Sequence, residues 1–494
     1  MSLNDSKQTI TLSLISHTNV GKTTLARTLL KKDIGVIRDD AHVTDTSEAY
    51  IMLETNNGFV LRLWDTPGFG NSAKLLKRLQ NIPRPTGWFV NEVWDRIDDR
   101  ANWCNQQALR NVREDADVVL YLVNAAENPI EAGYVDCEMQ ILDWLSKPVI
   151  VLLNQTGPPR EAVVEAGEEK LWEDHLQRFE VVKYVMSLDA FARCRIQENI
   201  LMKTIEGVLP FAKRNSFDEI WKAWAINNNS VFERSMDSLA GQITAACCDR
   251  EHITQKSIWE LAQYKVPIPG MSSDIKKEKE DAMKKLADRL EGEVKSSLDE
   301  LIQLHQLKGN AAAEILKRLS SDYLSNKPVN EGVSAIVGGF FTGAISGVGA
   351  DFLAGGLTFG GGAVVGGILG AVGAAGLTRG YNYFRGDNNS FIRWSLPLYQ
   401  ELFSSALLRY LAVAHFGRGR GEYTESEYPE FWKSSVLQIV HERQKEIKAL
   451  WQAGKRETNT SRLTVQTKKL LTDMVQQLLK EFYSEAYHID PTFK

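Results

Sequence analysis

The chain has 494 residues, which is long enough for two or three domains that each bury a core of their own. Its formal net charge is −5 and its acidic and basic residues are well mixed, which argues against a protein devoted to coating nucleic acid. The five cysteines show no C-x-x-C spacing, so the composition indicates a reducing compartment, with neither a disulfide framework nor a zinc site. The first seven residues contain no apolar signal core, and we therefore expect a cytoplasmic protein.

A phosphate-binding loop is the first motif along the chain. The β-branched run 9–15 predicts a strand, the segment 25–30 predicts a helix, and the sequence SHTNVGKTT (16–24) lies between them. In such a loop the backbone N–H groups cradle the phosphates, the lysine spans the β and γ oxygens, and the hydroxyl that follows holds Mg²⁺. The residues expected to bind the phosphates are Asn19, Val20, Gly21, Lys22, Thr23 and Thr24.

Further strand patterns predict an open α/β sheet. Residues 48–55 and 59–64 flank the turn Asn56-Asn57-Gly58, which is typical of a hairpin. The continuous apolar runs 118–123 and 148–153 are typical of buried parallel strands. A sheet of this kind binds its ligand at the C-terminal ends of its strands.

The sequence DTPG (65–68) follows one of these strands. An aspartate at this point can hold Mg²⁺ through water, and Gly68 can offer its backbone N–H to a γ-phosphate. Thr44 lies where a mobile loop could bring a hydroxyl to the metal and the γ-phosphate, and Thr46 is the alternative. We therefore expect Thr23, Thr44 and Asp65 at the metal. The residues expected to act on the γ-phosphate are Lys22, Thr44 and Gly68.

These motifs resemble the GTPases of the Era and TrmE type. The resemblance covers residues 7–212 and rests on SHTNVGKTTL, the loop threonine and WDTPG. The longer segments WDTPGFG, NVREDADVVLYLVNAAE, PVIVLLNQTGPPR and SLDAFARC are similar to bacterial proteins that join such a domain to a C-terminal domain of unknown function. The resemblance implies a Ras-like P-loop NTPase fold, binding of GTP and GDP with Mg²⁺, and slow, switch-like hydrolysis.

Two positions that bear on nucleotide binding depart from the pattern of these GTPases. Ser16 replaces the first glycine of the loop, so the turn into the loop must accept a Cβ atom. The sequence NQTG (154–157) replaces N-K-x-D and lacks the carboxylate that would accept two hydrogen bonds from guanine. Asn154 and Gln155 are still expected beside the base, but the choice between GTP and ATP stays open.

The remaining departure concerns hydrolysis. Phe69 stands where Ras-like proteins keep a water-orienting glutamine, and Era- and TrmE-like GTPases share such a hydrophobic substitution. Asn19 matches the loop asparagine that helps some of them bind K⁺ near the β- and γ-phosphates. We therefore hypothesise K⁺-assisted hydrolysis, with Asn19 near the cation. Ser187-Leu188, which follows the strand pattern 181–186, resembles the last loop that contacts the base.

The second half of the chain predicts a mostly α-helical domain, because strand patterns stop at about residue 213. Within it, residues 332–380 are rich in glycine, and Asp351 is the only charged residue between Gly332 and Thr378. Small residues recur every fourth position, which on a helix makes a narrow ridge that a second backbone can approach. We interpret 332–380 as a glycine-zipper helical hairpin. The repeated small residues are Ala335, Gly339, Gly343, Gly347, Gly362, Gly366, Gly370 and Ala374.

The sequence leaves two interpretations of this hairpin open. Each helix is near the lower limit for crossing a bilayer, and basic residues flank the pair, in line with the positive-inside tendency. The alternative is a buried hairpin within a soluble domain, since glycine lowers both hydrophobicity and helix propensity. We favour association with the inner face of the cell membrane, through a lipid or membrane-protein partner.

These patterns together predict a GTP-binding protein in which residues 1–212 form the GTPase domain and residues 213–494 the helical domain. We expect a slow GTP hydrolase that acts as a nucleotide-dependent switch. The alternatives are a membrane-embedded structural or pore-forming protein gated by nucleotide, and a ribosome or RNA assembly GTPase. The helical half contains no KH, RRM or zinc module, so the sequence predicts no nucleic-acid partner and leaves oligomerisation open.

Overall fold

The computed structural model divides into two compact units, which are described separately. The first contains the described residues up to Ser230 together with 414–415 and 482–483, and the second contains those from Val231 to Val413 and from Thr424 to Glu481. The structure describes residues 8–18, 20–32, 34, 48–80, 100–156, 162–188, 195–253, 273–307, 390–415, 430–454 and 460–483.

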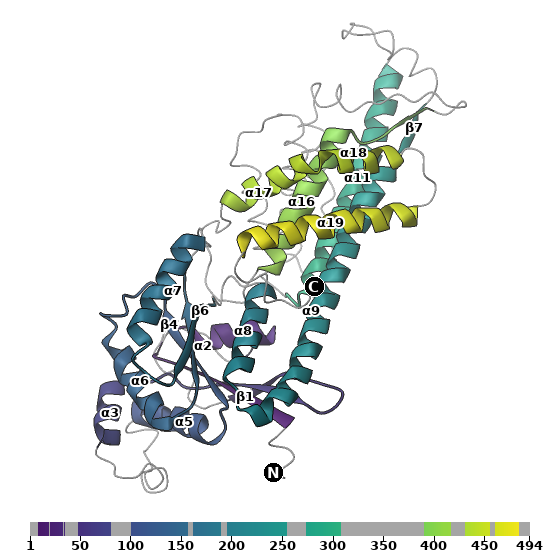
Figure 1. Ribbon diagram of the computed structural model, residues 1–494. Helices are drawn as coiled ribbons and strands as arrows, with labels where there is room; N and C mark the ends of the chain where they lie inside the picture. The colour runs from purple at the N-terminus through teal and green to yellow at the C-terminus, as the bar shows by residue number, and fades with distance from the viewer. Residues whose placement is uncertain are drawn as a thin grey trace. The chain divides into compact units, whose positions relative to one another are not determined.

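The first unit is built on a six-stranded sheet in the order β2-β3-β1-β4-β5-β6 (Figure 1). All neighbouring strands of this sheet are parallel except β2 and β3, which pair in the antiparallel sense. This arrangement confirms the predicted open α/β sheet and the Ras-like fold class. The strands are β1 (Thr9–Ser16), β2 (Glu48–Glu54), β3 (Val60–Asp65), β4 (Val118–Asn124), β5 (Val149–Asn154) and β6 (Val182–Ser187).

The central strands are buried on both faces because their apolar runs are continuous. Alternate residues of β4 serve different cores: Leu120 belongs to one cluster of buried side chains, and Val119 and Tyr121 belong to the other. This alternation is the period-two geometry of a strand. Every residue of β5 is buried, as a strand covered on both faces requires.

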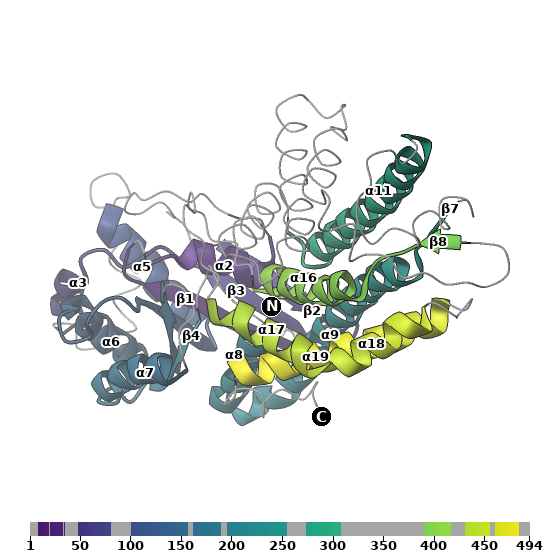
Figure 2. The same cartoon turned by 90° about the horizontal axis from the view of Figure 1, so that it is seen from above.

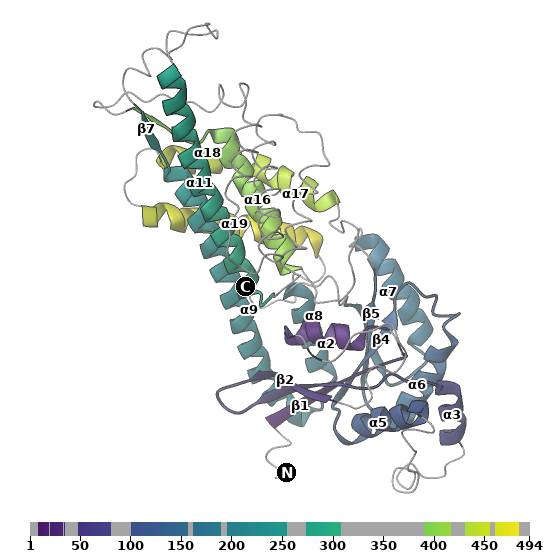
Figure 3. The same cartoon turned by 180° about the vertical axis from the view of Figure 1, so that it is seen from behind.

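Helices cover both faces of the sheet (Figures 1 and 3). One core contains side chains from α2, α8 and the first part of α9, and the other contains side chains from α3, α5, α6 and α7. The helices of this unit are α2 (Lys22–Leu30), α3 (Ser72–Gln80), α5 (Arg100–Glu114), α6 (Gly133–Leu145), α7 (Ala162–Leu176), α8 (Arg195–Val208) and the start of α9 (Phe211–Cys248).

The predicted hairpin is present at the edge of the sheet. β2 and β3 are joined through a turn in which Gly58 adopts a φ of 79°, a left-handed conformation that favours glycine. The N–H groups of Thr55 and Gly58 close this turn, donating to Phe59 O and Thr55 O respectively at 2.9 Å. The sequence pattern therefore located both strands and the turn.

The second unit is helical apart from one short strand pair, among the residues described (Figure 2). Its fully buried Arg409 links three helices, because the guanidinium donates to Gln242 on α9, to Val294 O on α11, and to Ser405 O in its own helix. The elements are the later part of α9, β7 (Glu251–Ile253), α11 (Ser273–Leu304), β8 (Ser390–Ile392), α16 (Leu396–Ala414), α17 (Glu430–Glu442), α18 (Gln444–Ala453) and α19 (Thr460–Phe482).

Two expectations about this half stay predictions. The glycine-zipper hairpin at 332–380 lies outside the described residues. The boundary expected after residue 212 falls just inside α9, and the division into 1–212 and 213–494 is not decided by it. In the described ranges, no helix combines the length and the apolar composition that a membrane crossing would need.

The packing of α18 on α9 gives a stability prediction for the second unit. A Cβ atom added at Gly454 would lie 2.3 Å from Cys247 Sγ and 3.0 Å from Cys247 O, so Gly454→Ala must displace the Cys247 side chain and crowd the α9 backbone. We expect it to lower the free energy of unfolding by about 1–3 kcal/mol in urea denaturation, the usual cost of overpacking.

Gly241→Ala is the matched control for this change. Gly241 lies within α9, and an added Cβ atom would meet nothing within 4 Å outside its own turn of helix. Because alanine is the better helix former, this variant should be more stable than the wild type by about 0.5–1 kcal/mol. Equal stability of the two variants would show that the Gly454 contact does not constrain the packing.

Candidate nucleotide-binding site

The phosphate loop lies between the C-terminal end of β1 and the first turn of α2. Gly21 precedes α2 with a φ of 93°, and a Cβ atom there would lie 2.8 Å from Asn154 Nδ2. Both the left-handed backbone and the close approach therefore demand glycine. Val20 and Thr24 are buried, so the loop is held against the core of the first unit by packing.

Lys22 opens α2 and is 8% exposed. Its ammonium donates to Ser16 Oγ at 2.9 Å and to His17 O at 3.4 Å. Ser16 is itself fully buried and donates its hydroxyl to His17 O. The serine that replaces the usual glycine is thus accommodated at the end of β1, and its hydroxyl holds the lysine side chain over the loop.

Thr23 and Asp65, both expected at the metal, are brought together. Thr23 Oγ1 donates to Asp65 Oδ2 at 2.7 Å, although 42 positions separate the two residues. Asp65 ends β3 and is 3% exposed, and burial raises the pKa of its carboxyl to about 6. The hydrogen bond from Thr23 and the charge of Lys22 act in the opposite direction but do not cancel the effect of burial.

The donor set at this point fits Mg²⁺. A threonine hydroxyl and a carboxylate are hard oxygen ligands of the kind that this ion prefers. Asp65 Oδ1 is buried and has no hydrogen-bond partner within the described residues, which is uncommon for a buried polar atom. A water of an ion bound here would satisfy that oxygen.

The DTPG segment lies directly against the phosphate loop. A Cβ atom at Gly68 would be 2.9 Å from Lys22 Nζ and 3.0 Å from Thr18 Cα, so only glycine allows this approach. The next residue, Phe69, donates its N–H to Ser16 O at 2.9 Å, and its side chain is fully buried. The backbone at Gly68 therefore lies beside the lysine, as its expected role on the γ-phosphate requires.

The residues expected beside the base lie at the ends of β5 and β6. Asn154 is fully buried, and its Nδ2 donates to Val20 O at 2.7 Å, so this side chain holds the phosphate loop. Gln155 adopts a φ of 58° directly after the strand. Ser187 donates its N–H to Glu169 Oε1 at 2.7 Å, and Leu188 places its side chain in the core, leaving its backbone for any contact with a ligand.

Several predicted positions lie outside the described residues. These are Asn19, Thr44 with its alternative Thr46, and Gly157. Their expected roles at the metal, at K⁺ and at the base stay predictions.

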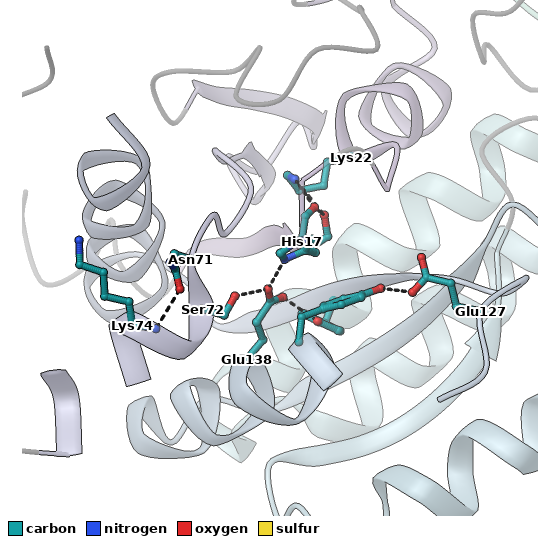
Figure 4. Close-up of polar contacts among 10 residues, drawn as sticks. His17, Lys22, Asn71, Ser72, Lys74, Glu127 and Glu138 are labelled. Carbon is teal, nitrogen blue, oxygen red and sulfur yellow. Dashed lines mark hydrogen bonds and ion pairs between the residues drawn. The ribbon is translucent and has the colours of Figure 1, made fainter. Parts of the chain in front are cut away.

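A polar cluster beside the loop was not predicted. Glu138, on α6, accepts a hydrogen bond from His17 of the phosphate loop and another from Ser72 at the start of α3 (Figure 4). His17 and Glu138 are 121 positions apart, so no local motif joins them. The only signal in the sequence is an acidic residue on the apolar face of a helix, next to the buried Met139.

Two family models match the chain, in the order that the sequence predicts. Residues 11–155 match the model described as 50S ribosome-binding GTPase. Residues 174–482, more than half of the chain, match a domain of unknown function, DUF3482. The chain belongs to the DUF3482 family. It joins this domain to an N-terminal GTPase domain, which confirms the organisation that the resemblance implied.

Solved structures with detectable similarity include two of Era. One is Aquifex aeolicus Era bound to GDP and AlF4⁻, with 21% identity and a TM-score of 0.31, and the match covers 41% of this chain and 57% of that chain. The other is Era with MgGDPNP and part of 16S ribosomal RNA, with 22% identity, the same coverages of 41% and 57%, and a TM-score of 0.31. The DUF3482 protein thus spans somewhat over half of each Era chain. A member of a bacterial dynamin pair matches with 10% identity over 98% of this chain and 77% of that chain, at a TM-score of 0.23. No curated protein matches the chain.

The buried carboxylate gives a prediction about stability and pH. Because the pKa of Asp65 is about 6 in the folded protein and 3.8 as the ordinary value, the folded state binds a proton that the unfolded state has released. The free energy of unfolding therefore falls as pH rises from about 4 to about 6, because the stabilisation from this proton uptake disappears over that range. Asp65→Asn should therefore stabilise the nucleotide-free protein by up to about 3 kcal/mol above pH 6, and by much less near pH 4.

Urea denaturation at several pH values measures this difference. Asp174→Asn, at an exposed aspartate of α7, is the control and should follow the wild type at every pH. An Asp65→Asn variant that is less stable than the wild type at pH 8 would contradict the prediction.

Proposed function

We propose that this DUF3482 protein is a Mg²⁺-dependent GTPase that hydrolyses GTP slowly and works as a nucleotide-dependent switch. The observation that carries the proposal is the contact between Thr23 and Asp65 beside a glycine-lysine-threonine turn, where Asp65 Oδ1 is buried and has no hydrogen-bond partner among the described residues. Two segments 42 positions apart converge there to give a hydroxyl, a carboxylate and an ammonium. This is the combination that a magnesium-bound triphosphate needs.

Each residue has a role in the proposal. Lys22 stabilises negative charge on the β and γ oxygens, and the N–H groups from Asn19 to Thr24 cradle the phosphates. Thr23 would hold Mg²⁺ directly and Asp65 through water, with Thr44 completing the site. The ion, when bound with the nucleotide, neutralises charge across the β- and γ-phosphates.

Hydrolysis should be slow because Phe69 cannot orient water. Its side chain is fully buried, and its N–H is engaged by Ser16 O. Gly68, one residue earlier, would donate its N–H to the γ-phosphate and so sense whether the nucleotide is a triphosphate. Loss of that phosphate would release the DTPG segment, which is how the switch would operate.

The proposed readout of the switch is the helical half of the chain. Residues 332–380 are apolar, rich in glycine and almost uncharged, and we propose that they meet the inner face of the cell membrane or a membrane protein there. Recovery of the full-length protein in the supernatant after detergent-free, high-salt extraction of cells would contradict this part of the proposal.

A ribosomal role is the second candidate, because the family model that matches residues 11–155 is named for ribosome-binding GTPases. It would overturn the expectation that nucleic acid is not a partner. Salt-sensitive co-sedimentation of the protein with ribosomes would favour this role over a membrane role.

Replacement of Lys22 tests the nucleotide site itself. Lys22→Ala removes a charge-assisted contact to phosphate, so we expect the affinity for GTP to fall about ten- to hundredfold. Titrations with GTP, ATP and XTP in the presence of Mg²⁺ also decide whether the NQTG sequence still selects guanine.

Lys32→Ala is the matched control, because Lys32 is exposed just beyond the C-terminal end of α2. It should bind GTP as the wild type does. Equal GTP affinity of the Lys22 and Lys32 variants would exclude the proposed site.

The cation hypothesis has its own test. We expect GTP turnover to be faster in K⁺ than in Na⁺ at equal ionic strength, because Asn19 would place K⁺ where it offsets charge on the β- and γ-phosphates. Asn19→Ala should remove this preference while keeping Mg²⁺-dependent binding. Equal wild-type turnover in the two salts would end the hypothesis.

A further inference from the structure

Glu138 lies at the centre of a buried hydrogen-bonding cluster that the proposed chemistry does not use. Its side chain is 0% exposed, and it accepts from His17 Nδ1, Ser72 Oγ and the hydroxyl of Tyr121 (Figure 4). No lysine or arginine of the described chain pairs with it. These three donors must therefore compensate the carboxylate, because an uncompensated buried charge is strongly unfavourable.

The two carboxylate oxygens have different partners. Oε1 accepts from His17 at 2.8 Å and from Ser72 at 2.5 Å, so one oxygen serves two separate segments of chain. Oε2 accepts from Tyr121 at 2.7 Å, and Tyr121 is part of the central strand β4. Burial, and then the charge of Glu138, raise the pKa of Tyr121 well above its ordinary value, so this phenol remains a donor.

The segments that share Oε1 are the two that a terminal phosphate would contact. His17 belongs to the phosphate loop, and its carbonyl oxygen accepts a hydrogen bond from the ammonium of Lys22. Ser72 opens α3, four residues after Gly68. His17 and Phe69 also form a parallel backbone bridge.

The ring of His17 is held in place by more than Glu138. It stacks on Tyr134 with the ring centroids 4.4 Å apart and the planes at 27°, and the Tyr134 hydroxyl donates to Glu127 Oε2 at 2.7 Å. A carboxylate only accepts, so the His17 Nδ1 atom carries the proton in this contact. On the loop side, a ring stack adds to the hydrogen bond that His17 makes with Glu138, whereas Ser72 reaches Glu138 through its hydroxyl alone.

We infer that Glu138 is a positioning residue that couples the phosphate loop, through His17, to the start of α3, through Ser72. The inference rests on the proposed function of the neighbouring nucleotide site. Together with the backbone hydrogen bond from Phe69 to Ser16, the Ser72–Glu138 bond holds the DTPG segment close to Lys22, where the N–H of Gly68 can reach a γ-phosphate. The bond therefore favours triphosphate over diphosphate, which Gly68 does not contact.

The ratio of the dissociation constants for GDP and a non-hydrolysable GTP analogue tests this coupling. Ser72→Ala and Glu138→Met, which leaves no acceptor oxygen, should each weaken binding of the analogue about fivefold or more while changing GDP binding less than about twofold. The double variant should match Glu138→Met alone, because the contact between Ser72 and residue 138 is already lost in that single variant.

Tyr121→Phe is the matched control. It removes a donor from the same carboxylate, but the donor comes from a strand in the middle of the sheet. It should lower the melting temperature and leave the nucleotide ratio unchanged. A merely structural role for Glu138 would lower the stability of all three single variants and leave the ratio unchanged in each, and that result would overturn the inference.

The design separates this inference from the proposed function. If the wild type binds neither nucleotide, the proposed site fails and the coupling fails with it. If the wild type binds both and Ser72→Ala leaves the ratio unchanged, only the coupling is wrong. Ser72→Ala is a small change at a helix start, so the test remains decisive even if the Glu138 variant does not fold.

Discussion

A buried carboxylate that is paired on only one of its oxygens is the feature around which the nucleotide-binding edge is organised. Asp65 takes a hydrogen bond from Thr23 on one oxygen, while the other is buried and has no hydrogen-bond partner in the part of the chain that the structure describes. Folded proteins ordinarily pair their buried polar atoms, so the arrangement carries a cost in the free protein. Binding of a cation, as proposed, would offset that cost.

Much of the nucleotide-binding edge can be predicted from local patterns in the sequence. The apolar runs at 118–123 and 148–153 are typical of strands covered on both faces. The turn at Gly58 needs a backbone conformation that glycine adopts readily. The glycine-lysine-threonine sequence also predicts its flanking elements, because a phosphate loop requires a strand before it and a helix after it. Parallel strands then bring their C-terminal ends to one edge, which explains why Thr23 and Asp65 meet as expected.

Pairings across the chain could not be predicted in the same way. Nothing near His17 or near Glu138 in the sequence indicates that they touch, because their contact depends on how α6 packs on the sheet. A single glutamate among apolar helix residues usually signals an exposed position, and here it is fully buried. Ser16 is similar: the sequence marked it as a departure, but only the structure gives its hydroxyl a partner in Lys22.

The hydroxyl of Ser16 has a consequence for how the nucleotide leaves. A phosphate-loop lysine normally loses its main anionic neighbour when the ligand departs, and the vacated loop is then poorly satisfied. Here the loop itself supplies two oxygen atoms to the ammonium. Under the proposed function, release of a nucleotide would therefore leave the lysine hydrogen-bonded within its own loop, which lowers the free-energy cost of that release.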